Sequence, residues 1–299
     1  MLSSKTDTHG AQMLGPSSWT NNPLSSAISL STTSQILITV FATTVILLNI
    51  IFFRLVSILS RPAPSSRPQA SSSNPTHILI VLGSGGHTAE MLNILSQAPC
   101  LQLDFTYRTY VVSSGDGFSA LKAHEFEKSL LADLSSTPGI TVPDHTSTNY
   151  DIVTVHRARR VHQGLLTAPW TSLRCLLDCI DVLKGTHRDL KSSQNKQRGY
   201  PDLILTNGPG TGVIVVLASI ILLFFRCSGP RHGHQGSQPA SFTHSGQMRT
   251  IFIESFARVK TLSLSGRLLK PLVHRFIVQW PDLVKSQGSK VEYIGPLVT

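Results

Sequence analysis

The sequence has 299 residues, a formal net charge of +10 and a pI near 9.8, and 41% of its residues are hydrophobic. That length is enough for one substantial hydrophobic core or two small ones, and the positive charge predicts a phosphate-rich partner: nucleic acid, an anionic membrane surface or a phosphorylated substrate. Nucleic acid is the least favoured of the three, because aromatic residues make up only 7%, the basic residues are scattered, and no RNA-recognition or zinc-finger signature occurs.

The N-terminal part predicts a membrane anchor. Residues 1–35 are rich in Ser, Thr and Asn and predict a disordered tail, whereas residues 36–59 are apolar apart from Arg54. An apolar helix of 18–24 residues rises roughly 27–36 Å, enough to cross a membrane, and it begins too late in the chain for a cleaved signal peptide. Arg54 lies near the C-terminal end of this run and Arg61 and Arg67 follow it, whereas only Lys5 precedes it, so the tail is expected in the lumen and the C-terminal part in the cytosol.

After a Pro/Ser linker at 60–76, short apolar runs alternate with helical patterns. The predicted strands are 77–82, 109–113, 151–155, 202–206, 250–254 and 275–279, and the predicted helices are 87–98, 118–132, 166–184, 211–225 and 262–272. This alternation predicts an α/β fold with one Rossmann-like, doubly wound parallel sheet over 77–299. The apolar run 212–225 has only 14 residues, so a buried core helix is favoured over a membrane segment.

Two polar stretches, 186–200 and 228–247, interrupt this alternation and predict surface insertions. His232 and His234 lie in the second insertion, where no third metal ligand is near. The four cysteines contain no C-x-x-C pair, and reduced, mostly buried thiols are expected.

The stretch "VLGSGGHTAEML" (81–92) joins the first predicted strand to a helix. A glycine turn at a helix N-terminus can hold an anion, since backbone N–H groups there lack partners within the helix. The candidate phosphate-binding residues are Gly83, Ser84, Gly85, Gly86 and Thr88. Thr88 stands where a dinucleotide motif needs glycine, and a P-loop lysine is missing, so neither NAD nor ATP is expected. A plain tight turn is the alternative.

Two more loops of this kind follow later strands. The first contributes Asn207, Gly208, Pro209, Gly210 and Thr211, and the second contributes Glu254, Ser255 and Arg258. Ligands of open parallel sheets bind outside the carboxyl ends of the strands, where all three loops are expected. Together they predict a phosphate-binding site.

His87 and Glu254 are the candidate catalytic residues. His87 is suited to general-base catalysis, or else it caps the helix or anchors a ligand by a hydrogen bond. Glu254 is a second base, a group that orients an acceptor hydroxyl, or an ion-pair partner for Arg258. No D-x-D sequence occurs, so no metal is expected. The basic run "HRARRVH" (156–162) is more typical of a solvated face than of a site, although beside a membrane it could contact lipid headgroups or a substrate pyrophosphate.

Four motifs, "GSGGHTAEM", "NGPGTGV", "ESFARVKTLSLSGR" and "FIVQWPDL", occur in this order. They resemble the membrane-anchored subunit of the eukaryotic UDP-N-acetylglucosamine transferase, which adds the second sugar of the dolichol-linked oligosaccharide in N-glycosylation. The resemblance covers about residues 77–299. The glycine–histidine loop is also similar to the bacterial transferase that adds N-acetylglucosamine to a lipid-linked peptidoglycan precursor. The insertions and the long N-terminal tail depart from the compact family pattern.

The resemblance implies half of an enzyme. This chain would be the N-terminal, acceptor-binding half of a GT-B glycosyltransferase on the cytosolic face of the endoplasmic reticulum and its continuous nuclear envelope. A soluble partner subunit would bind UDP-N-acetylglucosamine, and no cofactor is implied. Independently, the 223 residues from 77 onward suit one doubly wound domain better than the two that such a transferase needs.

The C-terminal sequence "VEYIGPLVT" is apolar with one charge, Glu292. The resemblance implies that it docks the partner through Tyr293, Ile294, Gly295, Pro296, Leu297 and Val298. A last strand on the domain's own core is the alternative. Three functional hypotheses remain: an acceptor-binding subunit of an inverting, metal-independent transferase, a non-catalytic membrane scaffold for the partner, and a self-sufficient transferase.

Overall fold

The computed structural model describes residues 32–61, 76–98, 101–136, 149–159, 163, 167–190, 200–208, 210–225, 246–295 and 297. The contacts divide the chain into two units, Met1–Phe52 and Phe53–Thr299. Most of the predicted tail, linker and insertions lies outside the described residues. So do Cys100, Pro209, Cys227, His232, His234, Pro296 and Val298.

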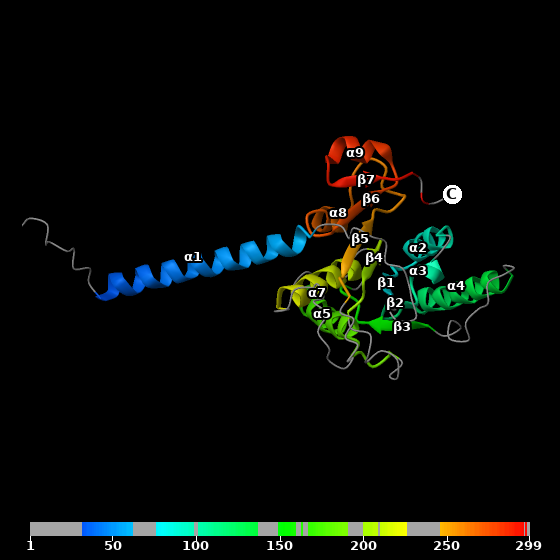
Figure 1. Cartoon of the computed structure of the whole chain (residues 1–299), viewed down its shortest axis with the longest axis horizontal. Coiled ribbons are helices and arrows are strands. Elements are labelled where there is room, and N and C mark those ends of the chain that lie inside the picture. The colour runs from blue at the N-terminus through cyan, green and yellow to red at the C-terminus, as the bar shows by residue number, and fades with distance from the viewer. Residues whose placement is uncertain are drawn as a thin grey trace, which may run out of the picture. The chain divides into compact units, whose positions relative to one another are not determined.

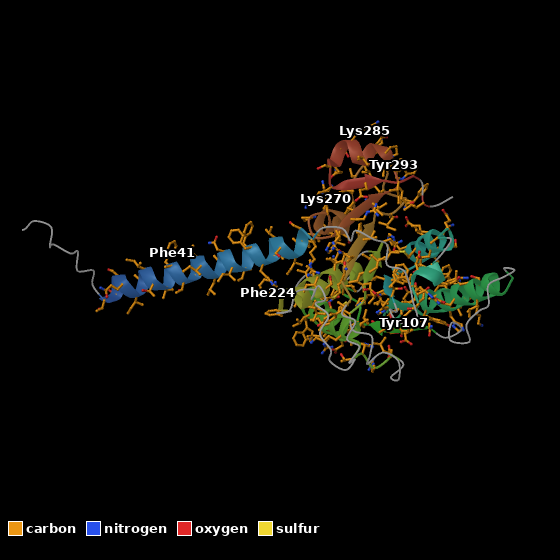
Figure 2. All side chains as sticks on the ribbon, viewed as in Figure 1. Phe41, Tyr107, Phe224, Lys270, Lys285 and Tyr293 are labelled. Atoms are coloured by element: carbon orange, nitrogen blue, oxygen red, sulfur yellow. The ribbon has the colours of Figure 1, made fainter. Side chains whose placement is uncertain are left out.

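The first described element is α1 (Thr32–Leu59), which begins four residues before the predicted apolar run. Its most apolar stretch of 18 residues has a mean hydropathy of 2.6, and α1 is the one helix among the described residues long and apolar enough to cross a membrane. Figure 2 labels Phe41, which projects from the helix with 71% of its surface exposed. The hydroxyls of Thr39 and Thr43 donate to carbonyls one turn earlier, so these polar groups are satisfied inside the helix, as an apolar surrounding requires.

The end of α1 belongs to the second unit. The Arg54 guanidinium donates to the carbonyls of Leu223 and Phe224, at 3.3 Å each, and Ile58 is 2% exposed within the core. The domain core therefore starts before the predicted linker.

The second unit is built on one parallel sheet of seven strands in the order β3-β2-β1-β4-β5-β6-β7 (Figure 1). The strands are β1 (His77–Val81), β2 (Tyr107–Ser113), β3 (Tyr150–Val155), β4 (Leu203–Thr206), β5 (Arg249–Ile253), β6 (Arg275–Val278) and β7 (Val291–Tyr293). The predicted single Rossmann-like sheet is confirmed, and β7 is an addition. Strands of a parallel sheet are covered on both faces, which explains why six of them were visible as apolar runs.

Helices cover both faces of the sheet. They are α2 (Gly86–Ser96), α3 (Leu101–Asp104), α4 (Gly117–Ser136), α5 (Ala168–Lys184), α7 (Thr211–Phe225), α8 (Leu264–Leu269) and α9 (Pro281–Gln287). Ile78 and Ile80 pack into the core formed with α2 and α4, whereas Leu79 and Val81 point to the opposite face and pack with α5 and α7. A third cluster joins α8 and α9 to β5 and β6.

Helix α7 contains the second apolar run. Much of it is buried, including Val215, Val216 and Leu223, which confirms the predicted core helix. The thiols of Cys175 and Cys179 on α5 are free and buried, as predicted for these two cysteines.

Candidate functional site

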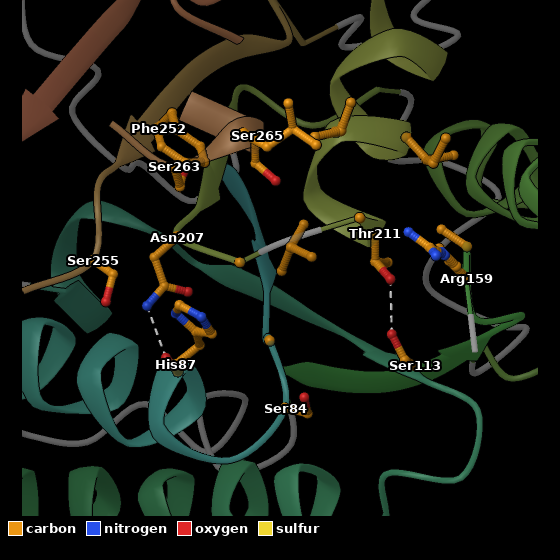
Figure 3. A pocket seen from close by; sticks show the side chains of 18 of the residues that line it. Ser84, His87, Ser113, Arg159, Asn207, Thr211, Phe252, Ser255, Ser263 and Ser265 are labelled. Carbon is orange, nitrogen blue, oxygen red and sulfur yellow. Dashed lines mark hydrogen bonds between the residues drawn. The ribbon is translucent and has the colours of Figure 1, made fainter. Parts of the chain in front are cut away.

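A cavity of about 870 Å³ lies at the carboxyl edge of the sheet. The loops that follow β1, β3, β4 and β5 line it, together with the end of β2 and parts of α7 and α8. Figure 3 shows the polar side chains of Ser84, His87, Ser113, Arg159, Asn207 and Ser255 around it. All three predicted loops contribute, so the sheet brings together segments that are far apart in the sequence.

Two glycines allow the β1 and β4 loops to approach each other. A Cβ on Gly83 would lie 3.3 Å from the Cα of Gly208 and only 2.7 Å from the Cβ of His87. A Cβ on Gly208 would lie 3.1 Å from the Cα of Gly83. Gly85 is the N-cap of α2 and has φ of 60°, a conformation that other residues rarely adopt. The glycines therefore set the position of His87 at the start of α2.

Only part of the predicted glycine loop lines the cavity. Gly83, Ser84 and His87 do so, whereas Gly85, Gly86 and Thr88 are not among the lining residues. Thr88 is fully buried, and its hydroxyl bonds the Gly83 carbonyl and, at 2.6 Å, the Ser119 hydroxyl. The prediction that the Thr88 hydroxyl binds phosphate is wrong, because this hydroxyl is hydrogen-bonded inside the protein, where it stabilises the turn.

The β4 loop holds the β1 loop in place. The side-chain amide of Asn207 donates to the His87 carbonyl at 2.8 Å, and the hydroxyls of Thr211 and Ser113 are 2.8 Å apart (Figure 3). Asn207, Gly208, Gly210 and Thr211 all line the cavity, and their role in phosphate binding stays a prediction. The site thus spans the ends of β1, β2 and β4.

Glu254 lines the cavity but is 1% exposed. Its Oε2 accepts from the N–H and the hydroxyl of Ser263, at 3.1 Å each, and the Ser263 hydroxyl caps α8 by accepting from the Gly266 N–H. No ion pair joins Glu254 to Arg258 in the described part of the chain, so that alternative is wrong. The carboxylate instead secures the start of α8.

Positive charge gathers around the cavity. Arg157, Arg159 and Arg258 all line it, and none of the three forms an ion pair with another described residue. Glu254 is the one carboxylate in the described lining. Arg159 is exposed and Arg157 is half-buried, so the predicted solvated face fits Arg159, while a phosphate contact by either arginine stays a prediction. Arg157 and Arg159 directly follow the end of a strand, and this position in the sequence could have predicted that they lie at the cavity.

Glu90 is a site residue that the sequence did not suggest. It lies on α2 one turn after His87, and its Oε2 is 3.8 Å from the His87 Nδ1. Burial alone would raise the pKa of the Glu90 carboxyl, but the His87 contact and hydrogen bonds from Phe256, Gln279 and Ser255 together lower it. The residue is therefore an ionised neighbour of the candidate base.

The C-terminal segment divides into two parts. Val291–Tyr293 forms β7 on the domain's own sheet, paired with β6. Beyond it Ile294 is 54% exposed, and Leu297 packs against the core cluster that contains Ile78 and Ile80. Partner docking by this segment stays a prediction, as does the absence of a metal. Among the described residues no group of three His, Cys, Asp or Glu side chains is placed to hold one.

The sequence between residues 78 and 297 matches the profile described as "Oligosaccharide biosynthesis protein Alg14 like". The chain belongs to the Alg14 family. This confirms the resemblance seen in the four motifs. No solved structure matches the chain significantly.

Three relatives illustrate the similarity within the Alg14 family, and each carries the name UDP-N-acetylglucosamine transferase subunit alg14 or ALG14. The Aspergillus fumigatus protein is 44% identical over 220 residues, which cover 65% of this chain and 93% of the relative. The Schizosaccharomyces pombe protein is 36% identical, covering 73% and 82%. The Rattus norvegicus protein is 33% identical, covering 74% and 82%.

Proposed function

We propose that this chain is the membrane-anchored, acceptor-binding subunit of a UDP-N-acetylglucosamine transferase. The reaction transfers N-acetylglucosamine from UDP-N-acetylglucosamine to N-acetylglucosaminyl-diphosphodolichol. One observation carries the proposal: a cationic cavity with a histidine on its wall lies at the carboxyl edge of a single Rossmann-like sheet. The names of the relatives support the transferase, and the cavity supports the acceptor role.

The lining of the cavity suits a lipid diphosphate. Arg157, Arg159 and Arg258 supply positive charge, and α2 and α7 begin at the cavity with their N-termini, which favour anions. The remaining wall is apolar at α8, where Leu264 is 74% exposed and Leu268 is 52% exposed. In a lipid diphosphate, the phosphate groups match the cationic part of the lining and the isoprenoid chain matches the apolar part at α8.

In the proposed reaction His87 takes the proton from the 4-hydroxyl of the acceptor sugar. The hydroxyl oxygen forms a bond to the anomeric carbon of UDP-N-acetylglucosamine, while the bond from that carbon to the phosphate oxygen breaks. UDP leaves with the electron pair. One displacement inverts the configuration and yields a β1,4 linkage without a metal ion. Glu254 secures α8 beside the acceptor, and Ser255 and Arg258 follow it along the wall.

The sugar nucleotide is held mainly by a soluble partner subunit. A transferase of this architecture needs two Rossmann-like domains with a cleft between them, and the described residues of the second unit form one sheet. The exposed end of the chain, including Tyr293 and Ile294, is the proposed docking segment. Helix α1 anchors the pair in the endoplasmic reticulum membrane, with the domain in the cytosol in accord with Arg54 near the C-terminal end of the span and Arg61 after it.

Turnover by the full chain reconstituted with its soluble partner tests the site. We expect His87→Ala to lower kcat by ~10²–10⁴-fold, the usual cost of losing a general base. Near-normal turnover by folded His87→Ala would remove the base assignment. Retention of full activity after further changes in the glycine loop would favour the scaffold hypothesis, in which this chain only recruits the partner.

Arg258→Ala tests acceptor binding separately. Losing one charge-assisted contact to the diphosphate should raise the KM for the lipid acceptor ~10-fold. Arg188 is a matched control, because it is exposed at 83% and does not line the cavity. Arg188→Ala should leave this KM unchanged. Equal effects of the two substitutions would argue against a specific phosphate contact.

A further inference from the structure

The side chain of Glu90 joins α2 to the loop after β5. Its Oε1 accepts from the Phe256 N–H at 2.6 Å and from the side-chain amide of Gln279. Its Oε2 accepts from the Ser255 hydroxyl at 3.1 Å. Only 9% of the side chain is exposed. These contacts fix the carboxylate in one orientation, with Oε2 facing the imidazole of His87.

The Nδ1 atom of His87 is buried and has no hydrogen-bond partner among the described residues. The nearest acid is Oε2 of Glu90, at 3.8 Å, a distance that permits charge attraction but is too long for a hydrogen bond. The ring itself lines the cavity, and Figure 3 shows it rising from the start of α2 beside Asn207. A carboxylate on the Nδ1 side favours the tautomer with its proton on Nδ1, which leaves the lone pair on Nε2.

We propose that Glu90 is a positioning residue for His87: it selects the tautomer in which Nε2 can accept a proton and stabilises the imidazolium that results. When Nε2 accepts the proton of the acceptor hydroxyl, the ring becomes a cation with a proton on each nitrogen, and the adjacent carboxylate offsets that charge. This inference rests on the proposed role of His87 as the base. It adds a residue that does not itself line the cavity.

The same contacts have a structural consequence that the experiment must separate. Glu90 connects α2 to Ser255 and Phe256, so its loss also loosens the wall of the cavity. Gln279 provides the control, because Gln279→Ala removes one of these contacts and leaves the Glu90 carboxylate beside His87. If Glu90 acts only by stabilising the cavity wall, Glu90→Gln and Gln279→Ala should lower kcat to a similar extent.

The experiment is a double-mutant cycle on the full chain reconstituted with its soluble partner. The five proteins are wild type, Glu90→Gln, His87→Ala, the double variant and Gln279→Ala. We expect Glu90→Gln to lower kcat ~10–100-fold with little change in the KM for the lipid acceptor, while Gln279→Ala stays within ~3-fold of wild type. In the His87→Ala background the same Glu90 substitution should change kcat less than ~3-fold, because its effect passes through the imidazole.

Two outcomes would overturn the inference: equal losses from Glu90→Gln with and without His87, or equal losses from Glu90→Gln and Gln279→Ala. Glu90→Asp keeps the negative charge and replaces Glu90→Gln in the experiment if that variant does not fold. Glu90→Asp should retain more activity than Glu90→Ala. Equal activity of Glu90→Asp and Glu90→Ala would also overturn the inference. Failure of the proposed function looks different. In that case His87→Ala alone keeps near-normal turnover, whatever Glu90 does.

Discussion

At the scale of single residues, most polar side chains that line the cavity or lie behind it have a defined partner. The Asn207 amide donates to the His87 carbonyl, and the Thr88 hydroxyl donates to the Gly83 carbonyl. The Glu254 carboxylate accepts from the Ser263 hydroxyl. The Nδ1 atom of His87 has no hydrogen-bond partner among the described residues, and Arg157, Arg159 and Arg258 form no ion pair there, although Arg159 donates a hydrogen bond to the Gln163 carbonyl. The framework of the site is therefore hydrogen-bonded, whereas its three guanidinium groups have no carboxylate partner.

One buried ion pair far from the cavity gives a stability prediction. Glu127 accepts from Arg108 at 2.6 and 2.8 Å and from the Tyr110 hydroxyl at 2.7 Å, and both charged side chains are at most 4% exposed. Glu127→Gln leaves the Arg108 charge buried without its partner, so we expect a loss of about 3–5 kcal/mol in the free energy of unfolding.

The measurement is the urea-induced unfolding of the detergent-solubilised chain. Glu125 is the control on the same helix, because its ion pair with Lys122 is solvent-exposed. Glu125→Gln should cost less than about 1 kcal/mol. Similar losses for the two substitutions would contradict the account of the buried pair.

At the scale of elements, the start of α8 depends on a glycine. A Cβ on Gly266 would lie 2.1 Å from Oε2 of Glu254 and 3.1 Å from the Ser263 hydroxyl. Gly266→Ala must therefore displace the carboxylate from Ser263, and we expect a destabilisation of about 1–3 kcal/mol together with a weaker acceptor affinity.

Gly117 at the start of α4 serves as the neutral comparison, because a Cβ added there would have no atom within 4 Å. Gly117→Ala should be neutral or slightly stabilising. The measurement is the melting temperature of both variants. A Gly266→Ala protein with the melting temperature of wild type would show that the Glu254 carboxylate does not need the space beside Gly266.

The boundary between fold and tail gives a second prediction at this scale. Val291 is 3% exposed and belongs to the cluster with α8 and α9, so a deletion that starts at residue 291 removes part of the core. A deletion of residues 294–299 leaves β7 in place. We expect the shorter deletion to fold and to lose binding to the soluble partner in a pull-down assay. Full binding after this deletion would place the docking surface elsewhere.

The sequence predicted the elements that are long and apolar. Strand β2 begins two residues earlier than predicted, because Arg108 is polar and becomes compatible with the interior only through Glu127. The elements β7, α3 and α9 are too short for a periodic pattern. In the site, topology alone brought the three loops together. The burial of Thr88 depends on which face of α2 packs against the domain, and the position of Arg157 beside the cavity depends on the geometry of the loop after β3. Glu90 was not predicted because its partners, Ser255 and Gln279, are distant in the sequence.

At the scale of the whole molecule, the chain combines one apolar helix suited to a membrane with one Rossmann-like domain. Under the proposed function these parts bring a lipid-linked acceptor and a soluble sugar-nucleotide-binding subunit together. Under the same proposal the domain offers a cationic cavity and the partner supplies the opposite wall of the active cleft.

The most direct test is to measure both acceptor binding and sugar transfer with the purified full chain, first alone and then with the soluble subunit. The account predicts that the chain alone binds N-acetylglucosaminyl-diphospholipid and transfers no sugar until the partner is added. Transfer at the full rate by the chain alone, or failure of the chain to bind the lipid diphosphate, would contradict it.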